Sequence, residues 1–255
     1  MNKSRGLIDL LSLRGRGCIV VLEAYLDEAG THRGAEMLCV AGYVGNRKEW
    51  YSFERFWSKK LKDSGISCFH AKEPDCNILK LPLAIAIEDR KLRGFIVSVR
   101  PEVYNLHAGA QLKSSLGNAY SACATTCAIQ ICQYAKKNKL GPVSFIYESG
   151  QPNAQRVLQV LEMLALEKPD YKIASVSLAR KDEFLPLQTA DFLSHSYSVR
   201  DQPWLAYLVR SGDRVSYSVA SAEHIAKTSQ DIKAWINHQR KMRQNLKRKI
   251  NDSES

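Results

Sequence analysis

The sequence lacks several motifs that identify common enzyme classes. It has no G-x-S-x-G nucleophile elbow, no phosphate-binding P-loop and no G-x-G-x-x-G dinucleotide motif. These absences argue against nucleophile-elbow hydrolases, nucleotide triphosphatases and dehydrogenases of the usual kinds.

The chain also lacks a long apolar run. None of its apolar segments approaches the roughly 18 residues that a membrane-spanning helix needs. Near the start, Asp9 interrupts a short apolar stretch, and no small-residue cleavage site follows it. The sequence therefore predicts neither a membrane span nor a signal peptide, and it favours a cytoplasmic protein.

The seven cysteines form no C-x-x-C pair. Their odd number, and their position mostly in apolar runs, favour reduced thiols in the cytoplasm. The spacing of Cys123, Cys127 and Cys132 would suit a metal knuckle, but these residues lie in a helical pattern without a matching histidine pair. The sequence therefore disfavours a zinc site there.

Basic residues outnumber acidic ones, 37 to 26, which gives a formal net charge of +11. This excess favours a polyanionic partner, and nucleic acid is the first to consider. A generally basic surface is the alternative. The segment HQRKMRQNLKRKI has six basic residues and no acid, which suits contact with a phosphate backbone, a solvated helix face or an acidic protein partner. The six residues are Arg240, Lys241, Arg243, Lys247, Arg248 and Lys249.

The 255 residues, 45% of them hydrophobic, are enough for one domain with a sizeable core. Runs of β-branched residues alternate with helical periods. This alternation predicts an α/β fold in which residues 18–200 form the main domain, between an N-terminal extension (1–17) and a helical, basic C-terminal extension (201–255). Strands are expected within 18–30, 37–45, 66–75, 94–100, 142–150 and 171–178, and helices at 47–62, 78–92, 111–139, 153–167, 186–199 and 223–250.

Three acidic residues stand where catalytic chemistry would need them. Asp27 and Glu148 end separate predicted strands, and Asp191 lies on the helix that Pro186 opens. Strand ends gather at one edge of an α/β sheet, and clustered carboxylates there need protons or cations. We therefore expect Asp27, Glu148 and Asp191 to bind Mg²⁺ or Mn²⁺, although solvated strand-end acids are also common.

Neighbouring residues extend this candidate site. Gln188, Asp191 and His195 share one helix face, where His195 is either a hydrogen-bonding helix residue or a proton carrier, and Gln188 supports Asp191. His70 and Glu73 in FHAKEPD either contribute to the site or form a polar turn.

Glu28 adjoins Asp27, so a regular strand directs only one of the two toward the metal. We expect that residue to be Asp27.

Two short motifs stand far apart in the chain, YLDEAG at 25–30 and QTAD at 188–191. They match the opening Tyr-x-Asp-Glu-Ser-Gly and the later Gln-x-Ala-Asp of the domain of unknown function 3800 family, which the sequence therefore resembles. The resemblance covers residues 20–199 and implies a ribonuclease H-like mixed sheet flanked by helices, with metal-dependent nuclease chemistry at Asp27, Glu148 and Asp191, and less securely Glu28 and Glu73. Two departures are Ala29 for the usual serine and Glu148 for a frequent aspartate.

The sequence as a whole predicts a metal-dependent nuclease that acts on RNA or DNA. The alternatives are a nucleic-acid-binding module without catalysis, of a defence or mobile-element system, and a protein-interaction component. A protein partner or a homo-oligomer is compatible with each of these functions.

Overall fold

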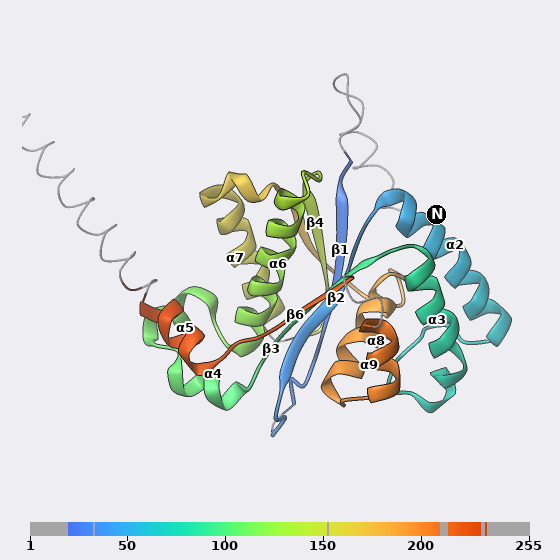
Figure 1. Ribbon diagram of the computed structural model, residues 1–255, viewed down its shortest axis with the longest axis horizontal. Helices are drawn as coiled ribbons and strands as arrows, with labels where there is room; N and C mark the ends of the chain where they lie inside the picture. The colour runs from blue at the N-terminus through green and yellow to red at the C-terminus, as the bar shows by residue number, and fades with distance from the viewer. Residues whose placement is uncertain (1–19, 33, 152, 210–213, 231–232, 234–255) are drawn as a thin grey trace, which may run out of the picture.

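The computed structural model describes residues 20–32, 34–151, 153–209, 214–230 and 233. These residues form a six-stranded sheet in the order β5-β4-β1-β2-β3-β6, with helices on both faces (Figure 1). The strands are β1 (Leu22–Ala29), β2 (Leu38–Asn46), β3 (Arg93–Val99), β4 (Val143–Glu148), β5 (Ile173–Ala179) and β6 (Val215–Val219).

The sheet is mixed. β2 lies between β1 and β3 and pairs antiparallel with both. The other three pairs are parallel: β4 with β1, β5 with β4, and β6 with β3. The predicted α/β class is confirmed, and the strand order and directions are compatible with a ribonuclease H-like sheet. Parallel pairing of β1, β4 and β5 brings their carboxyl ends to one edge.

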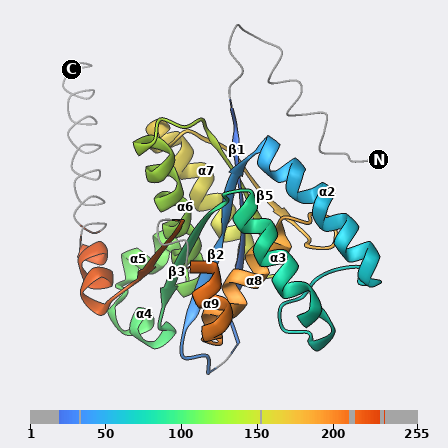
Figure 2. The same ribbon diagram turned by 45° about the vertical axis from the view of Figure 1, so that its right-hand side comes forward.

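Helices cover the sheet in two groups (Figures 1 and 2). On one face lie α4 (Pro101–His107), α5 (Ala110–Leu116), α6 (Ala119–Lys137) and α7 (Ala154–Glu167). On the other lie α2 (Arg47–Ser64), α3 (Asn77–Asp89), α8 (Leu187–Ser198) and α9 (Gln202–Val209). Short 3-10 turns occur at Pro74–Cys76 and Pro169–Tyr171. None of the described helices is both long and apolar enough to cross a lipid bilayer.

Each face of the sheet has its own apolar core. Under α6 the core contains Leu26, Phe145 and the buried cysteines of that helix. Under α2 and α8 it is strongly aromatic, and successive ring contacts run from β1 to α9. The rings in this series are Tyr25, Trp50, Phe53, Trp57, Phe69, Phe192, Trp204 and Tyr207.

The structure corrects three sequence predictions. Residues 66–73 contain no strand, because side chains from α8 accept hydrogen bonds from the backbone amides of Phe69 and Ala71. The helix expected at 111–139 is two helices, α5 and α6, because Gly117 adopts a left-handed backbone (φ 84°) between them. The sheet also continues beyond residue 200, since β6 pairs with β3.

Parts of the predicted extensions lie outside the described residues. Residues 222–230 are helical, in agreement with the start of the helix expected at 223–250. The extension at 1–17 and the six basic residues from Arg240 to Lys249 are outside the described part of the chain.

Candidate functional site

The carboxyl ends of three neighbouring strands deliver charged residues to one place. Asp27 is close to the end of β1, and Glu148 is the last residue of β4, which runs parallel to β1. Ala179, the last residue of β5, is opposite Glu148, and Lys181 follows it two residues later. The sheet register therefore places Asp27, Glu148 and Lys181 at the same edge.

Asp191 reaches this edge from α8, which packs against β1 and β2. Its Oδ2 accepts a hydrogen bond from the backbone amide of Ala71 at 2.7 Å, and its Oδ1 accepts one from Lys181 Nζ at 2.9 Å. The segment FHAKE thus supports Asp191 through its backbone. These two hydrogen bonds fix the orientation of the carboxylate.

Lys181 lies at the centre of a carboxylate cluster that consists of Asp27, Glu148 and Asp191. Its Nζ lies 2.7 Å from Glu148 Oε2, 2.9 Å from Asp191 Oδ1 and 3.3 Å from Asp27 Oδ2. The side chains are largely buried, with exposed fractions of 12% for Lys181 and 3% for Asp27. The structure therefore brings together the three predicted metal ligands, and they surround an ammonium group.

Burial and charge act against each other in this cluster. Burial raises the pKa of Asp27 well above its ordinary value, and the charge of Glu28 adds to this effect while Lys181 opposes it. Burial alone would lower the pKa of Lys181, but the charges of Asp27 and Asp191 outweigh it, so its pKa lies above the ordinary value. The ammonium group therefore stays protonated at neutral pH.

Gln188 holds the loop that carries Lys181. Its Nε2 donates to the backbone carbonyl of Lys181 at 2.9 Å, and its Oε1 accepts from Trp57 Nε1 at 2.7 Å and from the Phe69 amide at 3.2 Å. The side chain is fully buried. Gln188 therefore links α2, α8 and two loops beneath the site.

Glu28 and Tyr120 lie beside the cluster. Glu28 precedes the end of β1 by one residue, and burial and the charge of Glu148 raise its pKa to about 7. Tyr120 on α6 is 3% exposed, and its hydroxyl has no hydrogen-bond partner among the described residues. Burial, followed by the charges of Glu28, Asp27 and Glu148, raises the pKa of Tyr120 above its ordinary value. Its hydroxyl is thus within electrostatic range of the acids.

The remaining predicted site residues are less closely connected. No hydrogen bond or ion pair in the described part of the chain joins the side chain of His70, Glu73 or His195 to the three acids, and Glu73 is exposed. Burial lowers the pKa of His195, and the charge of Asp191 opposes this shift. His195 is therefore neutral at physiological pH.

The carboxylate oxygens of the cluster are of the kind that bind a hard cation, but their distances from the central position are those of hydrogen bonds to an ammonium group. Within the described ranges, no group of three or more His, Cys, Asp or Glu side chains is arranged to hold a metal ion. The oxygens lie 2.7–3.3 Å from Lys181 Nζ, whereas Mg²⁺ binds oxygens at about 2.0–2.1 Å. Asp27, Glu148 and Asp191 therefore fit a divalent ion if Lys181 withdraws and the carboxylates move inward.

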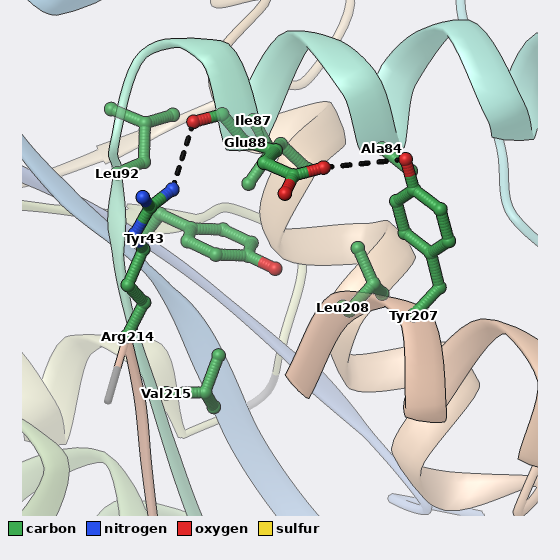
Figure 3. Close-up of a pocket in the computed structure, with 9 residues that line it drawn as sticks. All are labelled: Tyr43, Ala84, Ile87, Glu88, Leu92, Tyr207, Leu208, Arg214 and Val215. Carbon is green, nitrogen blue, oxygen red and sulfur yellow. Dashed lines mark hydrogen bonds between the residues drawn. The ribbon is translucent and has the colours of Figure 1, made fainter. Parts of the chain in front are cut away.

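Two cavities formed by the described residues lie away from the carboxylate cluster. One is lined by residues of β2, α3, α9 and β6, where Glu88 accepts hydrogen bonds from Tyr207 and Arg214 (Figure 3). Its volume of 10 Å³ is that of about one water molecule. A hollow of 310 Å³ lies at the opposite, amino end of β4 and is lined by Lys136, Lys139 and Lys172. Neither cavity includes the carboxylate cluster.

Sequence reasoning missed Lys181 and Tyr120. Lys181 is one of 37 Lys and Arg residues and lies in a loop, where no periodicity marks it. Tyr120 lies in the first turn of a largely buried helix and looks like an ordinary core residue. The only sequence signal for Lys181 is its position between a strand and the QTAD helix.

No model of a known protein family matches the sequence, and no curated protein is significantly similar to it.

Proposed function

We propose that the protein is a divalent-metal-dependent nuclease that hydrolyses phosphodiester bonds of RNA or DNA. The observation that carries the proposal is the convergence of Asp27, Glu148 and Asp191 on a single cation position. The three residues come from β1, β4 and α8, so the fold must form before the cluster exists. Carboxylates from distant elements are the usual ligands for metal-assisted phosphoryl chemistry.

Asp27, Glu148 and Asp191 would hold Mg²⁺ or Mn²⁺, with Glu28 beside them. A bound ion would supply Lewis acidity for the attack of water on phosphorus and for departure of the sugar oxygen. The Ala71 amide keeps Asp191 oriented, and Gln188 keeps the loop after β5 in place. Lys181 provides a positive charge at the edge that a substrate phosphate would approach.

The charge of the whole chain supports a nucleic-acid substrate. The carboxylate cluster repels a phosphate backbone unless cations offset it, and the formal net charge of +11 favours long-range attraction of a polyanion. The basic residues from Arg240 to Lys249 are the strongest candidates for backbone contact. We assign them to substrate binding and not to catalysis.

A cleavage assay tests the proposal. Purified full-length protein is incubated with labelled single-stranded RNA, RNA–DNA hybrid and duplex DNA, in Mg²⁺, in Mn²⁺ and in chelator. Metal-dependent cleavage should fall to background in Asp27→Asn and Asp191→Asn and persist in Asp170→Asn. Asp170 is a matched control, because it is an exposed acid paired with Lys136. Absence of cleavage of every substrate by the folded wild-type protein would contradict the proposal.

A non-catalytic nucleic-acid-binding module is the second candidate. The observation that favours it is Lys181 itself, which neutralises part of the cluster without a metal. This candidate predicts salt-sensitive binding of oligonucleotides that survives alanine substitution of Asp27, Glu148 and Asp191. Loss of binding in these variants, with the fold retained, would argue against it.

A further inference from the structure

The charges at the candidate site do not balance. Three carboxylates, of Asp27, Glu148 and Asp191, share one ammonium group. If all are ionised, the group keeps two negative charges at a largely buried position, which is costly. A divalent ion in place of the ammonium group would leave one net negative charge. With all three carboxylates ionised, a divalent ion at this position therefore offsets more of their charge than the single ammonium group does.

Lys181 enters the cluster from a surface loop. Its neighbours Arg180 and Asp182 are paired with each other on the outside, where their side chains are 65% and 46% exposed. The Lys181 side chain is 12% exposed, so part of it reaches the surface of the protein. The long, flexible lysine side chain gives the ammonium group a way to leave the cluster by rotamer changes that do not move the backbone.

The backbone of Lys181 is fixed independently of its side chain. Gln188 Nε2 donates to the Lys181 carbonyl, and Gln188 is fully buried with further bonds to Trp57 and Phe69. The ammonium group can therefore leave while the loop stays in place. The loop keeps Lys181 next to the site after it has left.

We propose that Lys181 and a divalent metal ion are alternative occupants of one cation position. In the metal-free protein the ammonium group holds the three carboxylates together. When a metal ion enters, it displaces the ammonium group of Lys181 toward solvent. The positive charge of Lys181 then lies at the rim of the site. This inference rests on the metal site of the proposed function, but it concerns binding and holds whether or not the protein cleaves nucleic acid.

Lysine footprinting of the wild-type protein tests the exchange without any substitution. The full chain is acylated briefly in chelator or in saturating Mn²⁺, and modification of each lysine is measured by mass spectrometry. Lys181 should be protected in chelator and become at least about fivefold more reactive in Mn²⁺, because acylation requires an accessible amine. Lys136, which is 60% exposed and paired with Asp170, is the internal control and should not change. Equal protection of Lys181 in both conditions would overturn the inference.

Metal affinity provides the second measurement. Mn²⁺ binding is measured by titration calorimetry for wild type, Lys181→Met and Lys136→Met. Removal of the competing ammonium group should tighten Mn²⁺ binding by about tenfold or more in Lys181→Met, and Lys136→Met should match wild type. Unchanged or weaker binding by folded Lys181→Met would overturn the inference. If Lys181→Met does not fold in chelator, the lysine footprinting of the wild-type protein decides whether the exchange occurs.

The two proposals fail in different ways. Tighter Mn²⁺ binding in Lys181→Met without cleavage by any form supports the exchange and contradicts the nuclease. Metal-dependent cleavage with unchanged Mn²⁺ affinity in Lys181→Met supports the nuclease and overturns the exchange.

Discussion

Gln188 Nε2 lies 2.9 Å from the backbone carbonyl of Lys181, the residue at the centre of the carboxylate cluster. The same amide group accepts hydrogen bonds from Trp57 and the Phe69 backbone through Oε1. A residue of the QTAD motif thus acts by organising the loops around the site. Its position beside Asp191 on α8 couples this support to one of the three carboxylates.

Gln188→Leu should destabilise the protein strongly. The substitution leaves two donors and one carbonyl without partners, and each orphaned buried group costs about 1–3 kcal/mol. We expect a loss of roughly 3–5 kcal/mol in the free energy of unfolding, measured by urea denaturation. Gln159→Leu, at an exposed position on α7, should change stability by less than about 0.5 kcal/mol. A similar small effect of both substitutions would show that Gln188 does not organise the site.

At Gly42, the backbone of β1 leaves no room for a side chain on β2. A Cβ added there would lie 1.9 Å from the Tyr25 carbonyl oxygen, which the paired strands cannot accommodate without moving. Gly42→Ala should therefore lower stability by roughly 3 kcal/mol or more in the same denaturation experiment.

Gly34→Ala is the matched control for this substitution. A Cβ at Gly34 would have no atom within 4 Å, but its φ of +86° is unfavourable for alanine. We expect a cost of about 1–2 kcal/mol from backbone strain alone. A smaller effect at Gly42 than at Gly34 would contradict the strand register.

Cys132 should be unreactive in the folded protein. It is 1% exposed, and burial raises the pKa of its thiol to about 12. At pH 8 only about one thiol in ten thousand is then deprotonated, and this fraction falls further as pH decreases. Alkylation by iodoacetamide, followed by peptide mass spectrometry, should label Cys132 in urea and leave it unlabelled in buffer. Rapid labelling in buffer at pH 8 would contradict the packing of α6.

The basic C-terminal segment should control the salt dependence of nucleic-acid binding. Replacing three of its cations by glutamine should weaken binding and reduce the slope of log K against log salt by about 0.9 per lost phosphate contact. A charge-matched control replaces three exposed lysines elsewhere and should have a smaller effect. The tail variant changes Lys247, Arg248 and Lys249, and the control changes Lys48, Lys62 and Lys168. Equal effects would mean that only net charge matters.

Much of the sheet could be predicted from the sequence, because its four central strands are mostly buried. Asp27 and Glu148 follow apolar runs that form β1 and β4, and parallel pairing of these strands brings the two acids together. β6 was missed because it is an edge strand in which only Val215 is buried, so it lacks a strong apolar pattern.

Other features depend on contacts between distant residues. The segment around Phe69 looks like a strand, but its amides bond to Gln188 and Asp191, which are more than 100 positions away in the chain. The position of Lys181 is also set by tertiary structure, since a flexible side chain is drawn into the cluster by three carboxylates. Local periodicity contains no information about either arrangement.

The most direct test of the account is anomalous diffraction from crystals of the full-length protein grown with Mn²⁺. The account predicts one or more manganese peaks among the carboxylates of Asp27, Glu148 and Asp191, with metal–oxygen distances of roughly 2.1–2.3 Å and Lys181 Nζ moved away. A cluster without a manganese peak, in which Lys181 Nζ still bridges the three carboxylates at saturating Mn²⁺, would contradict it.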